Sequence, residues 1–263
     1  IYSISQSNDT KISFEKYLKI FKNFNLKFKK LNNKNNILKK FNNLGGSISC
    51  DEELLLVSKS IAYFKKKLAS KIIYNFEVKD LKKNKNKFKI NNENFDCLIN
   101  CTGLGLELNY VKNLIYEYCV IFLYKKKRSI SDFALTIMDG PFFTLYPWSE
   151  KNEYGLYSVK DSRLLKNKKI KNLEKNVLKR INTKKLDKIR INVENKFMNY
   201  YPRFRDDFTF KKYLPSYRTI IKNKNDTRVC KIFQKKNEIT VFPGKIDHIF
   251  YAYDTIKKCL KKF

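Results

Sequence analysis

Apolar residues recur every three or four positions in four stretches of the chain, the spacing that places them on one face of an α-helix. The predicted helices cover residues 10–24, 52–69, 170–200 and 245–260. Thr10 or Ser13 can cap the first helix and Asp51 the second, because such short side chains accept a bond from a free backbone N–H.

Alternating or continuous apolar runs predict strands between these helices. Residues 76–81 and 88–90 are expected to form a hairpin, and the almost continuous run 95–101 is typical of a strand covered on both faces. Further strands are predicted at 114–124, 133–138, 142–147, 154–160, 217–221, 229–234 and 238–242. The middle third of the chain is therefore expected to be an antiparallel block.

This order of elements predicts a mixed α/β (α+β) chain with two domains. One domain is expected to be discontinuous, built from residues 1–106 and 216–263, and the second to be an antiparallel-sheet domain inserted between them at 107–215.

Composition adds one conspicuous feature, a formal net charge of +32 from 57 basic and 25 acidic residues. Such a charge is typical of proteins that bind nucleic acid or an anionic membrane. Only eight of the basic residues are Arg, however, and Arg is the preferred residue for bidentate phosphate and base contacts. Lys, Asn, Ile, Phe and Tyr all have A/T-rich codons, so drift in an A/T-rich genome explains the same composition. Both interpretations stay open at this point.

Other classes are excluded more firmly. The hydrophobic content of 43 % argues against a disordered chain, and seven glycines with five prolines argue against a collagen-like or linker class. No apolar run reaches the roughly 18–20 residues that span a bilayer, and no signal peptide is recognisable. The six cysteines form no CxxC pair and the chain has a single histidine, so a metal site is not expected. Reduced thiols in a cytoplasmic protein are expected instead.

Three segments are candidates for chemistry. The strand at 96–101 ends in Thr102-Gly103-Leu104-Gly105, where glycine allows a ligand to approach the backbone closely. In the second, a strand, Gly244 and a helix start are arranged so that backbone N–H groups, with the charge of Lys245, can face an anion or a polar ring edge. The third, 138–148, is dense in aromatic residues and suits the wall of an apolar pocket. Each segment also has an ordinary structural interpretation, as a turn or as core packing.

Taken in order, these segments resemble FAD-dependent oxidoreductases of the D-amino-acid oxidase/glycine oxidase group. NFDCLINCTG is similar to the strand and "ATG"-type turn of that group, and ITVFPGKIDHIFYA to its closing strand, glycine turn and helix. Cys50-Asp51, the following helix and 72–78 resemble the segment that leads to the adenine-side strand. Pro215-Ser216-Tyr217-Arg218 with Asp226-Thr227-Arg228 resembles a degenerate "GxRP…D" stretch. ALTIMDGPFFTLYP is similar to a subgroup associated with polysaccharide or surface-sugar biosynthesis. The resemblance covers roughly residues 45–263.

The resemblance implies an FAD/NAD(P)-binding-type domain, the discontinuous one, with the inserted domain binding substrate. It implies FAD as the cofactor and a small amine or sugar-linked molecule as the substrate, oxidised by hydride transfer to the flavin. The implied cofactor contacts are Val78 at the adenine, Cys101, Thr102, Gly103 and Gly105 along the FAD, and Gly244, Lys245 and Ile246 at the flavin O2 edge. The implied substrate residues are Arg218, Tyr146 and Asp139. No catalytic residue is assigned, and His248 is expected to pack in the last helix.

The chain departs from the family pattern at its start. The N-terminal strand–GxGxxG–helix that binds the FAD pyrophosphate is not found, no glycine precedes Gly45, and the first residue is Ile1. The chain is therefore expected to be the C-terminal portion of such an oxidoreductase. Two alternatives are retained: a basic nucleic-acid-binding protein and a non-catalytic remnant of the enzyme.

Overall fold

The structure is a computed structural model that describes most of the chain. The described residues are 1–6, 8, 10–32, 34–84, 87–103, 113–140, 142–149, 152–222, 228–242 and 244–261. They divide into two compact units. Unit 1 comprises residues 1–69, 118–165 and 176–216, and unit 2 comprises 70–117, 166–175 and 217–263.

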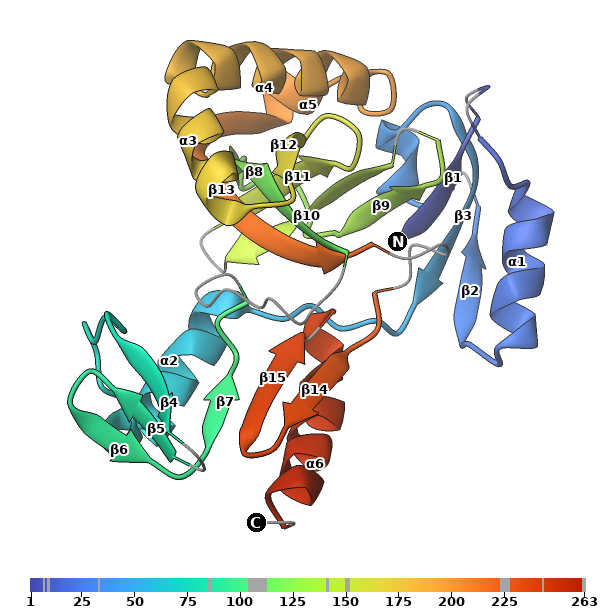
Figure 1. Ribbon diagram of the computed structural model, residues 1–263. Coiled ribbons are helices and arrows are strands. Elements are labelled where there is room, and N and C mark those ends of the chain that lie inside the picture. The colour runs from blue at the N-terminus through green and yellow to red at the C-terminus, as the bar shows by residue number, and fades with distance from the viewer. Residues whose placement is uncertain are drawn as a thin grey trace. The chain divides into compact units, whose positions relative to one another are not determined.

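Unit 1 is built on a large mixed sheet (Figure 1). Its strand order is β12-β8-β11-β10-β9-β1-β3-β2, and β13 also pairs with β8. The strands are β1 (Tyr2–Ser5), β2 (Phe28–Leu31), β3 (Leu44–Cys50), β8 (Leu114–Lys126), β9 (Leu135–Met138), β10 (Phe143–Ser149), β11 (Glu153–Ser158), β12 (Arg163–Asn167) and β13 (Phe208–Ile221). Strands β8 to β11 pair in antiparallel fashion, which confirms the predicted antiparallel block.

The first strand of the chain lies inside this sheet. β1 pairs in parallel with β9, where Tyr2 is opposite Thr136, and antiparallel with β3, where Tyr2 is opposite Ile48. Its alternation places Ile4 in a buried cluster while Ser3 and Ser5 form side-chain hydrogen bonds. No strand is predicted there from the sequence, because four residues are too few to show the pattern.

Helices cover this sheet, and their caps decide where they begin. They are α1 (Phe14–Asn23), α2 (Val57–Lys67), α3 (Ile170–Arg180), α4 (Thr183–Met198) and α5 (Phe204–Asp207), with 3-10 turns η1 (Leu38–Lys40) and η2 (Ala69–Lys71). Ser13 caps α1, as predicted. The prediction for α2 is wrong at its start: α2 begins at Val57 rather than 52, and its N-cap is Leu56, which makes no side-chain bond.

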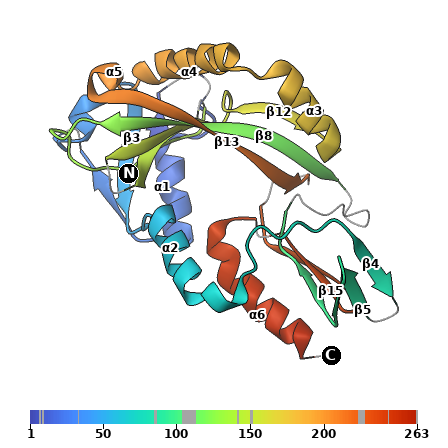
Figure 2. The same cartoon turned by 90° about the vertical axis from the view of Figure 1, so that its left-hand side faces the viewer.

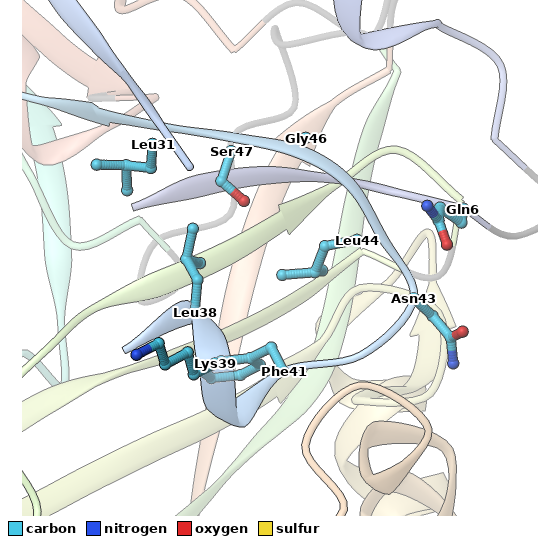
Figure 3. Close-up of a pocket in the computed structure, with 9 residues that line it drawn as sticks. All are labelled: Gln6, Leu31, Leu38, Lys39, Phe41, Asn43, Leu44, Gly46 and Ser47. Carbon is cyan, nitrogen blue, oxygen red and sulfur yellow. The ribbon is translucent and has the colours of Figure 1, made fainter. Parts of the chain in front are cut away.

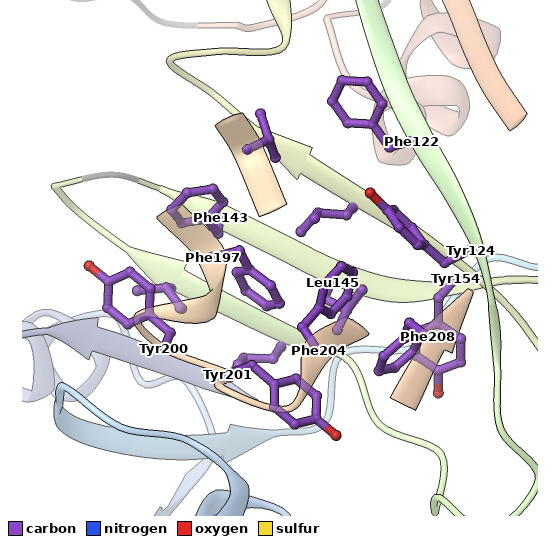
Figure 4. Close-up of a cluster of buried hydrophobic side chains, with 14 of the residues drawn as sticks. Phe122, Tyr124, Phe143, Leu145, Tyr154, Phe197, Tyr200, Tyr201, Phe204 and Phe208 are labelled. Carbon is purple, nitrogen blue, oxygen red and sulfur yellow. The ribbon is translucent and has the colours of Figure 1, made fainter. Parts of the chain in front are cut away.

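Aromatic side chains fill the core of unit 1. Phe197 on α4 is fully buried and contacts Phe143 and Phe204 at ring-centroid distances of 5.4 and 5.2 Å (Figure 4). Phe204 stacks on Phe208 at 5.1 Å. Because α4 runs along the sheet (Figure 2), rings from distant parts of the sequence interlock over one sheet face.

A buried ionic network lies beside these rings. Glu194 accepts hydrogen bonds from Arg190 (2.5 Å), Arg205 (2.8 Å) and the hydroxyl of Tyr124 (2.8 Å). A carboxylate that is 2 % exposed is tolerated here because several donors replace its lost hydration.

Unit 2 contains smaller elements. Its strands are β4 (Leu81–Asn84), β5 (Lys87–Ile90), β6 (Glu93–Phe95), β7 (Leu98–Asn100), β14 (Lys231–Lys235) and β15 (Glu238–Phe242), and η3 (Ile246–His248) leads into helix α6 (Ile249–Leu260). They form the sheets β14-β15-β7 and β4-β5-β6. β15 pairs in parallel with β7 and antiparallel with β14, and Ala252 of α6 packs on Ile239 and Val241 of β15.

Two predicted strands differ in this unit. The run 95–101 is divided between β6 and β7, which belong to different sheets. The predicted strand 76–81 begins only at Leu81. Its backbone is held instead by the amide of Asn91, which accepts from the N–H groups of Lys79 (3.0 Å) and Asp80 (3.3 Å) and donates to the carbonyl of Glu77 (3.0 Å).

Asparagine supplies many turns of this glycine-poor chain. The described non-glycine residues with φ between +49° and +64° are mostly Asn, namely Asn25, Asn43, Asn75, Asn91, Asn113 and Asn152, besides Asp139, Phe142 and Lys236. Asn tolerates the left-handed region better than other side chains because it bonds locally to the backbone.

The mixed α/β fold is confirmed. The structure groups residues 1–69 with the middle sheet, whereas the sequence prediction grouped them with the C-terminal segment. The roles of a cofactor domain and a substrate domain stay predictions. Across the described residues, no helix is long and apolar enough to cross a membrane.

Candidate functional site

The turn after β7 is the best-defined candidate for ligand binding. Asn100, the last residue of β7, is 3 % exposed, and its side-chain oxygen accepts from the backbone N–H (3.1 Å) and the hydroxyl (2.8 Å) of Thr102. The hydroxyl of Thr219 donates to the carbonyl of Gly103 at 2.9 Å. The turn is thereby fixed from both sides, while the neighbouring Cys101 is an exposed free thiol.

Gly103 differs from Gly244 in unit 2 and from Gly46 in unit 1, two other glycines with positive φ. A Cβ at Gly244 (φ +71°) would lie 2.3 Å from the carbonyl oxygen of Arg228, and a Cβ at Gly46 would collide with the ring of Phe14. A Cβ at Gly103 (φ +66°) would meet no described heavy atom within 4 Å. Gly103 therefore has open space beside its backbone, which a ligand can use.

The second candidate segment forms the predicted strand, glycine turn and helix. β15 ends at Phe242, Gly244 packs against the backbone of Arg228, and the chain enters η3. The backbone N–H of Lys245 donates to Nδ1 of His248 at 3.3 Å, and Ile246 is 66 % exposed. The start of η3 and α6 thus presents Lys245 and Ile246 at the surface of unit 2.

Val78 lies in the segment held by Asn91. The bonds from Asn91 use the carbonyl of Glu77 and the N–H of Lys79, which flank Val78, and neither uses the main chain of Val78 itself. Val78 is 44 % exposed. A main-chain contact at Val78, as the resemblance implies, is compatible with this arrangement.

Arg218 has a partner within the chain. Its Nε and Nη2 both lie 2.6 Å from the carboxylate of Glu117, which is 4 % exposed, on the paired strands β13 and β8. One edge of the guanidinium fork is therefore occupied by a buried internal carboxylate, the group that a substrate carboxylate would resemble.

Tyr146 lines a cavity of about 250 Å³ in unit 1. The other described lining residues are Ile1, Tyr2, Cys50, Glu52, Glu53, Leu54, Ala134, Thr136 and Thr144. Burial, together with Tyr157, raises the pKa of Tyr146 to about 12. Burial raises the pKa of Tyr2, and so does the bond that its hydroxyl donates to the Glu52 carboxylate.

Asp139 is used by the backbone of the same unit. It has a φ of +64°, and its carboxylate accepts from the N–H groups of Lys11 and Ile12, the latter at 2.7 Å. This side chain therefore ties the β9 turn to the segment before α1. It is not among the described residues that line the cavity beside Tyr146.

A second cavity of unit 1, of about 350 Å³, contains none of the predicted site residues (Figure 3). Two of its polar side chains are engaged within the fold: the Ser47 hydroxyl is 2.6 Å from that of Ser3, and the Asn43 amide donates to the carbonyl of Asn199 at 2.7 Å. We assign no function to this cavity.

Sequence reasoning missed Asn100, Asn91 and Glu117, the residues that hold the predicted ones in place. An Asn two residues before a Thr-Gly turn is a detectable signal for the first. Asn91 bonds to residues 11 to 14 positions away, and Glu117 to a residue 101 positions away, so no short motif marks either of them. Gly105 lies outside the described residues, and among the described ones no group of three or more His, Cys, Asp or Glu is placed to hold a metal.

The chain was compared with known protein families, sequences and structures. No model of a known protein family matches the chain. It is 25 % identical over 214 residues to the FAD-dependent monooxygenase FPY4 of Fusarium mangiferae, covering 81 % of this chain and 57 % of that protein. Its fold is similar to the crystal structures of glycine oxidase from Geobacillus kaustophilus (TM-score 0.59, 9 % identity) and of L-proline dehydrogenase from P. horikoshii (TM-score 0.60, 11 % identity). Each match covers 91 % of this chain, and 63 % and 65 % of those chains.

The predicted resemblance to FAD-dependent oxidoreductases is confirmed by these similarities. The fold of the chain is similar to part of the two solved structures, and the chain spans less than two thirds of the length of each of the three proteins.

Proposed function

We propose that the protein is an FAD-dependent oxidoreductase that removes a hydride from a small amine or a sugar-linked substrate. The observation that carries the proposal is Gly103, a left-handed glycine at the end of β7 whose Cβ position is open. Asn occupies six of the nine described non-glycine positions with positive φ, so a left-handed turn in this chain does not by itself require glycine. Close approach of a ligand gives a reason for glycine at position 103.

The residues of unit 2 fit such a cofactor. Asn100 and Thr219 fix the Thr102–Gly103 turn, and open α/β sheets bind ligands at the carboxyl ends of their strands. We propose that Cys101, Thr102, Gly103 and Gly105 line FAD and that the main chain of Val78 contacts its adenine. Asn91 acts as a positioning residue for Val78, because it holds the residues on either side.

The turn at Gly244 supplies the complementary charge. We propose that Lys245 and Ile246 approach the flavin ring edge, where the N–H groups at the start of η3 and α6 and the ammonium of Lys245 favour negative charge. When bound, FAD supplies the redox chemistry by accepting the hydride that leaves the substrate carbon. On the substrate side, Tyr146 remains our proposed contact. Asp139 and Arg218 are proposed to shape the site indirectly, since each is held by a partner of its own.

Flavin binding is the direct test. FAD titrated into the purified chain is expected to lose fluorescence and to show a perturbed visible spectrum, and Gly103→Ala is expected to weaken this binding about tenfold or more. Gly140→Ala, at another left-handed glycine with φ +57° in unit 1, is the matched control for backbone strain. Equal flavin affinity for Gly103→Ala and the wild type would contradict the assignment of this turn. No binding by the full-length protein would overturn the proposed function.

The two alternatives have separate tests. A nucleic-acid-binding protein would retain tight binding to a random-sequence duplex near physiological salt, whereas a merely lysine-rich surface loses it steeply as salt rises. A non-catalytic remnant would bind no flavin, or would bind it without reduction by any amine or sugar-linked substrate under anaerobic conditions.

A further inference from the structure

We propose that the ion pair between Glu117 and Arg218 positions the cofactor turn and that it acts through Thr219, the next residue along β13. This inference rests on the proposed function, because that function places FAD at the Thr102–Gly103 turn. Arg218 then serves the cofactor side of the site, whereas the sequence resemblance implies a substrate contact. Three observations carry the inference: the anchoring of two strand ends, the burial of the ion pair and the bond from Thr219 to the turn.

The paired ends of β8 and β13 are anchored to the sheet that carries the turn, and both ends belong to unit 2. The backbone N–H of Lys222 donates to the carbonyl of Asn113 at 2.9 Å. Leu114 and Ile221 pack on Phe242 of β15. Because β15 pairs in parallel with β7, these strand ends are tied to the sheet in which the turn begins.

Glu117 and Arg218 fix how the two strand ends lie against each other. The carboxylate belongs to a residue that is 4 % exposed, and Nε and Nη2 of Arg218 both lie 2.6 Å from it. A buried carboxylate that loses its cation is costly, so the pair opposes a slip of β13 against β8. A slip by a single residue would also turn every side chain of β13 to the other face. The pair therefore holds the register at this end of β13.

Holding Arg218 in place also directs Thr219. Successive side chains of a strand point to opposite faces, so Thr219 lies on the face opposite Arg218. Its hydroxyl donates to the carbonyl of Gly103 at 2.9 Å, across 116 positions of the sequence. The bonds that Asn100 accepts from Thr102 lie within the turn, whereas the Thr219 bond ties the turn to another strand. The placement of β13 thus sets the position of the Gly103 carbonyl.

This carbonyl belongs to the residue whose open Cβ position is proposed to face FAD. A turn that is held in one conformation before FAD binds reduces the ordering cost of binding. Loss of the Thr219 bond should therefore weaken FAD binding, although Thr219 is not itself a proposed cofactor contact.

FAD titration of the full chain, followed by flavin fluorescence, is the first test. Thr219→Val is expected to weaken FAD binding about 2- to 10-fold, the range for one neutral hydrogen bond. Thr219→Ser keeps the hydroxyl and should bind within about twofold of the wild type. Glu117→Gln is expected to weaken FAD binding about two- to fivefold. In the Thr219→Val background it should cause no further loss, because the pair acts through the Thr219 bond.

Labelling of Cys101 gives a second measure, which needs no flavin. This exposed thiol lies in the turn, and desolvation raises its pKa. Iodoacetamide reacts with the thiolate, so a loosened turn with a better solvated thiol should react about threefold or more faster in Thr219→Val and in Glu117→Gln. Peptide mapping by mass spectrometry separates Cys101 from the other cysteines, and Cys50 in unit 1 serves as the internal reference.

Two substitutions in unit 1 are matched controls. Thr10→Val removes a hydroxyl that donates to a backbone carbonyl, that of Ser5, at 2.9 Å. Arg205→Lys alters an arginine pair with the buried Glu194. Both variants should lose stability without a change in Cys101 labelling or in FAD affinity.

Three results would overturn the inference: unchanged Cys101 labelling in Thr219→Val, additive losses of FAD affinity in the double variant, or an effect of Glu117→Gln on Cys101 no larger than that of Arg205→Lys. Circular dichroism checks that each variant is folded. Absence of FAD binding by the wild type would overturn the proposed function, whereas the Cys101 rates would still decide whether the pair positions the turn.

Discussion

The two units of this chain are stabilised in different ways. Unit 1 has a long mixed sheet, a continuous aromatic cluster and a buried Glu194 network, whereas unit 2 has short strands and small apolar clusters. Exposed apolar side chains occur in both units. On α6 alone, Phe250 is 77 % exposed and Tyr253 62 %. Yet the turns that resemble cofactor contacts belong to unit 2. Tight packing and the candidate cofactor turns are thus separated along the chain.

The close contacts of the two units are made by different parts of the chain. In unit 1 the close contacts are made by side chains, so rings and ion pairs carry the fold. In unit 2 a close contact is made by the backbone at Gly244, and the Cβ position of Gly103 is open. Substitutions in the two units should therefore lower the stability of the protein for different physical reasons. The following experiments measure that contrast.

The largest contrast is expected from removing one ring in each unit. Phe197→Ala opens a cavity among Phe143, Tyr201 and Phe204 and should lower the free energy of unfolding by about 3–5 kcal/mol. Phe233→Ala removes a half-buried ring 6.0 Å from Phe242 in unit 2 and should cost about 2 kcal/mol. Urea unfolding followed by circular dichroism measures both free energies of unfolding. Equal losses of stability in the two variants would contradict the expected difference between the units.

Next in size is a backbone substitution in unit 2. Gly244→Ala places a methyl group 2.3 Å from the carbonyl oxygen of Arg228 and adds about 1–2 kcal/mol of left-handed strain, so a total loss above about 2 kcal/mol is expected. Gly103→Ala carries the strain without a collision and should cost only about 1–2 kcal/mol. Thermal unfolding of the two variants gives the comparison. A Gly244 variant as stable as the Gly103 variant would show that the β15 turn is looser than the structure indicates.

The buried carboxylates of the two units provide a third comparison. Glu194→Gln weakens bonds to two arginines and Tyr124 and should cost about 2–3 kcal/mol, whereas Glu117→Gln faces Arg218 and should cost about 1–2 kcal/mol. Denaturant midpoints at neutral pH separate the two variants. A reversed order would mean that the Glu117–Arg218 pair, at the ends of β8 and β13 that belong to unit 2, is the more tightly desolvated one.

The smallest effect is a loss of stability in alkali. Burial raises the pKa of Tyr124, Tyr154 and Tyr201, all in the core of unit 1, above the ordinary value near 10. The unfolded chain therefore releases these protons first, and the stability they confer is complete below pH ~10 and declines above it. At pH 10 the three together should cost roughly 1 kcal/mol. Tyrosinate absorbance should rise together with unfolding of unit 1, and ordinary titration in the folded state would contradict this.

The sequence predicted the elements whose signal is local. The strand at 238–242 matches β15, and 114–124 falls within β8, because long apolar runs leave few alternatives. β1 escaped prediction because its partners are distant in the chain. The helix start at Asp51 was wrong because good capping chemistry does not ensure that the following residues are helical.

Among site residues, the glycine turns could be predicted and their supports could not. Thr102–Gly103 and Gly244 are conspicuous in a chain with seven glycines. The partner of Arg218 lies 101 residues away, and the contacts of Asp139 with Lys11 and Ile12 span more than 120 residues. Such contacts are set by tertiary packing, which single-sequence patterns do not record.

The place of β1 in the large sheet has a consequence for synthesis on the ribosome. Tyr2 is paired with Thr136, so β1 cannot pair with its parallel neighbour β9 until about 134 further residues have been synthesised. At roughly 5–20 residues per second, that delay is about 7–27 s. While β1 is unpaired, its only apolar side chains are Tyr2 and Ile4. The alternating Ser3 and Ser5 lower its tendency to aggregate. A nascent chain arrested before residue 135 should therefore be more sensitive to protease in its first fifty residues than one arrested after residue 221.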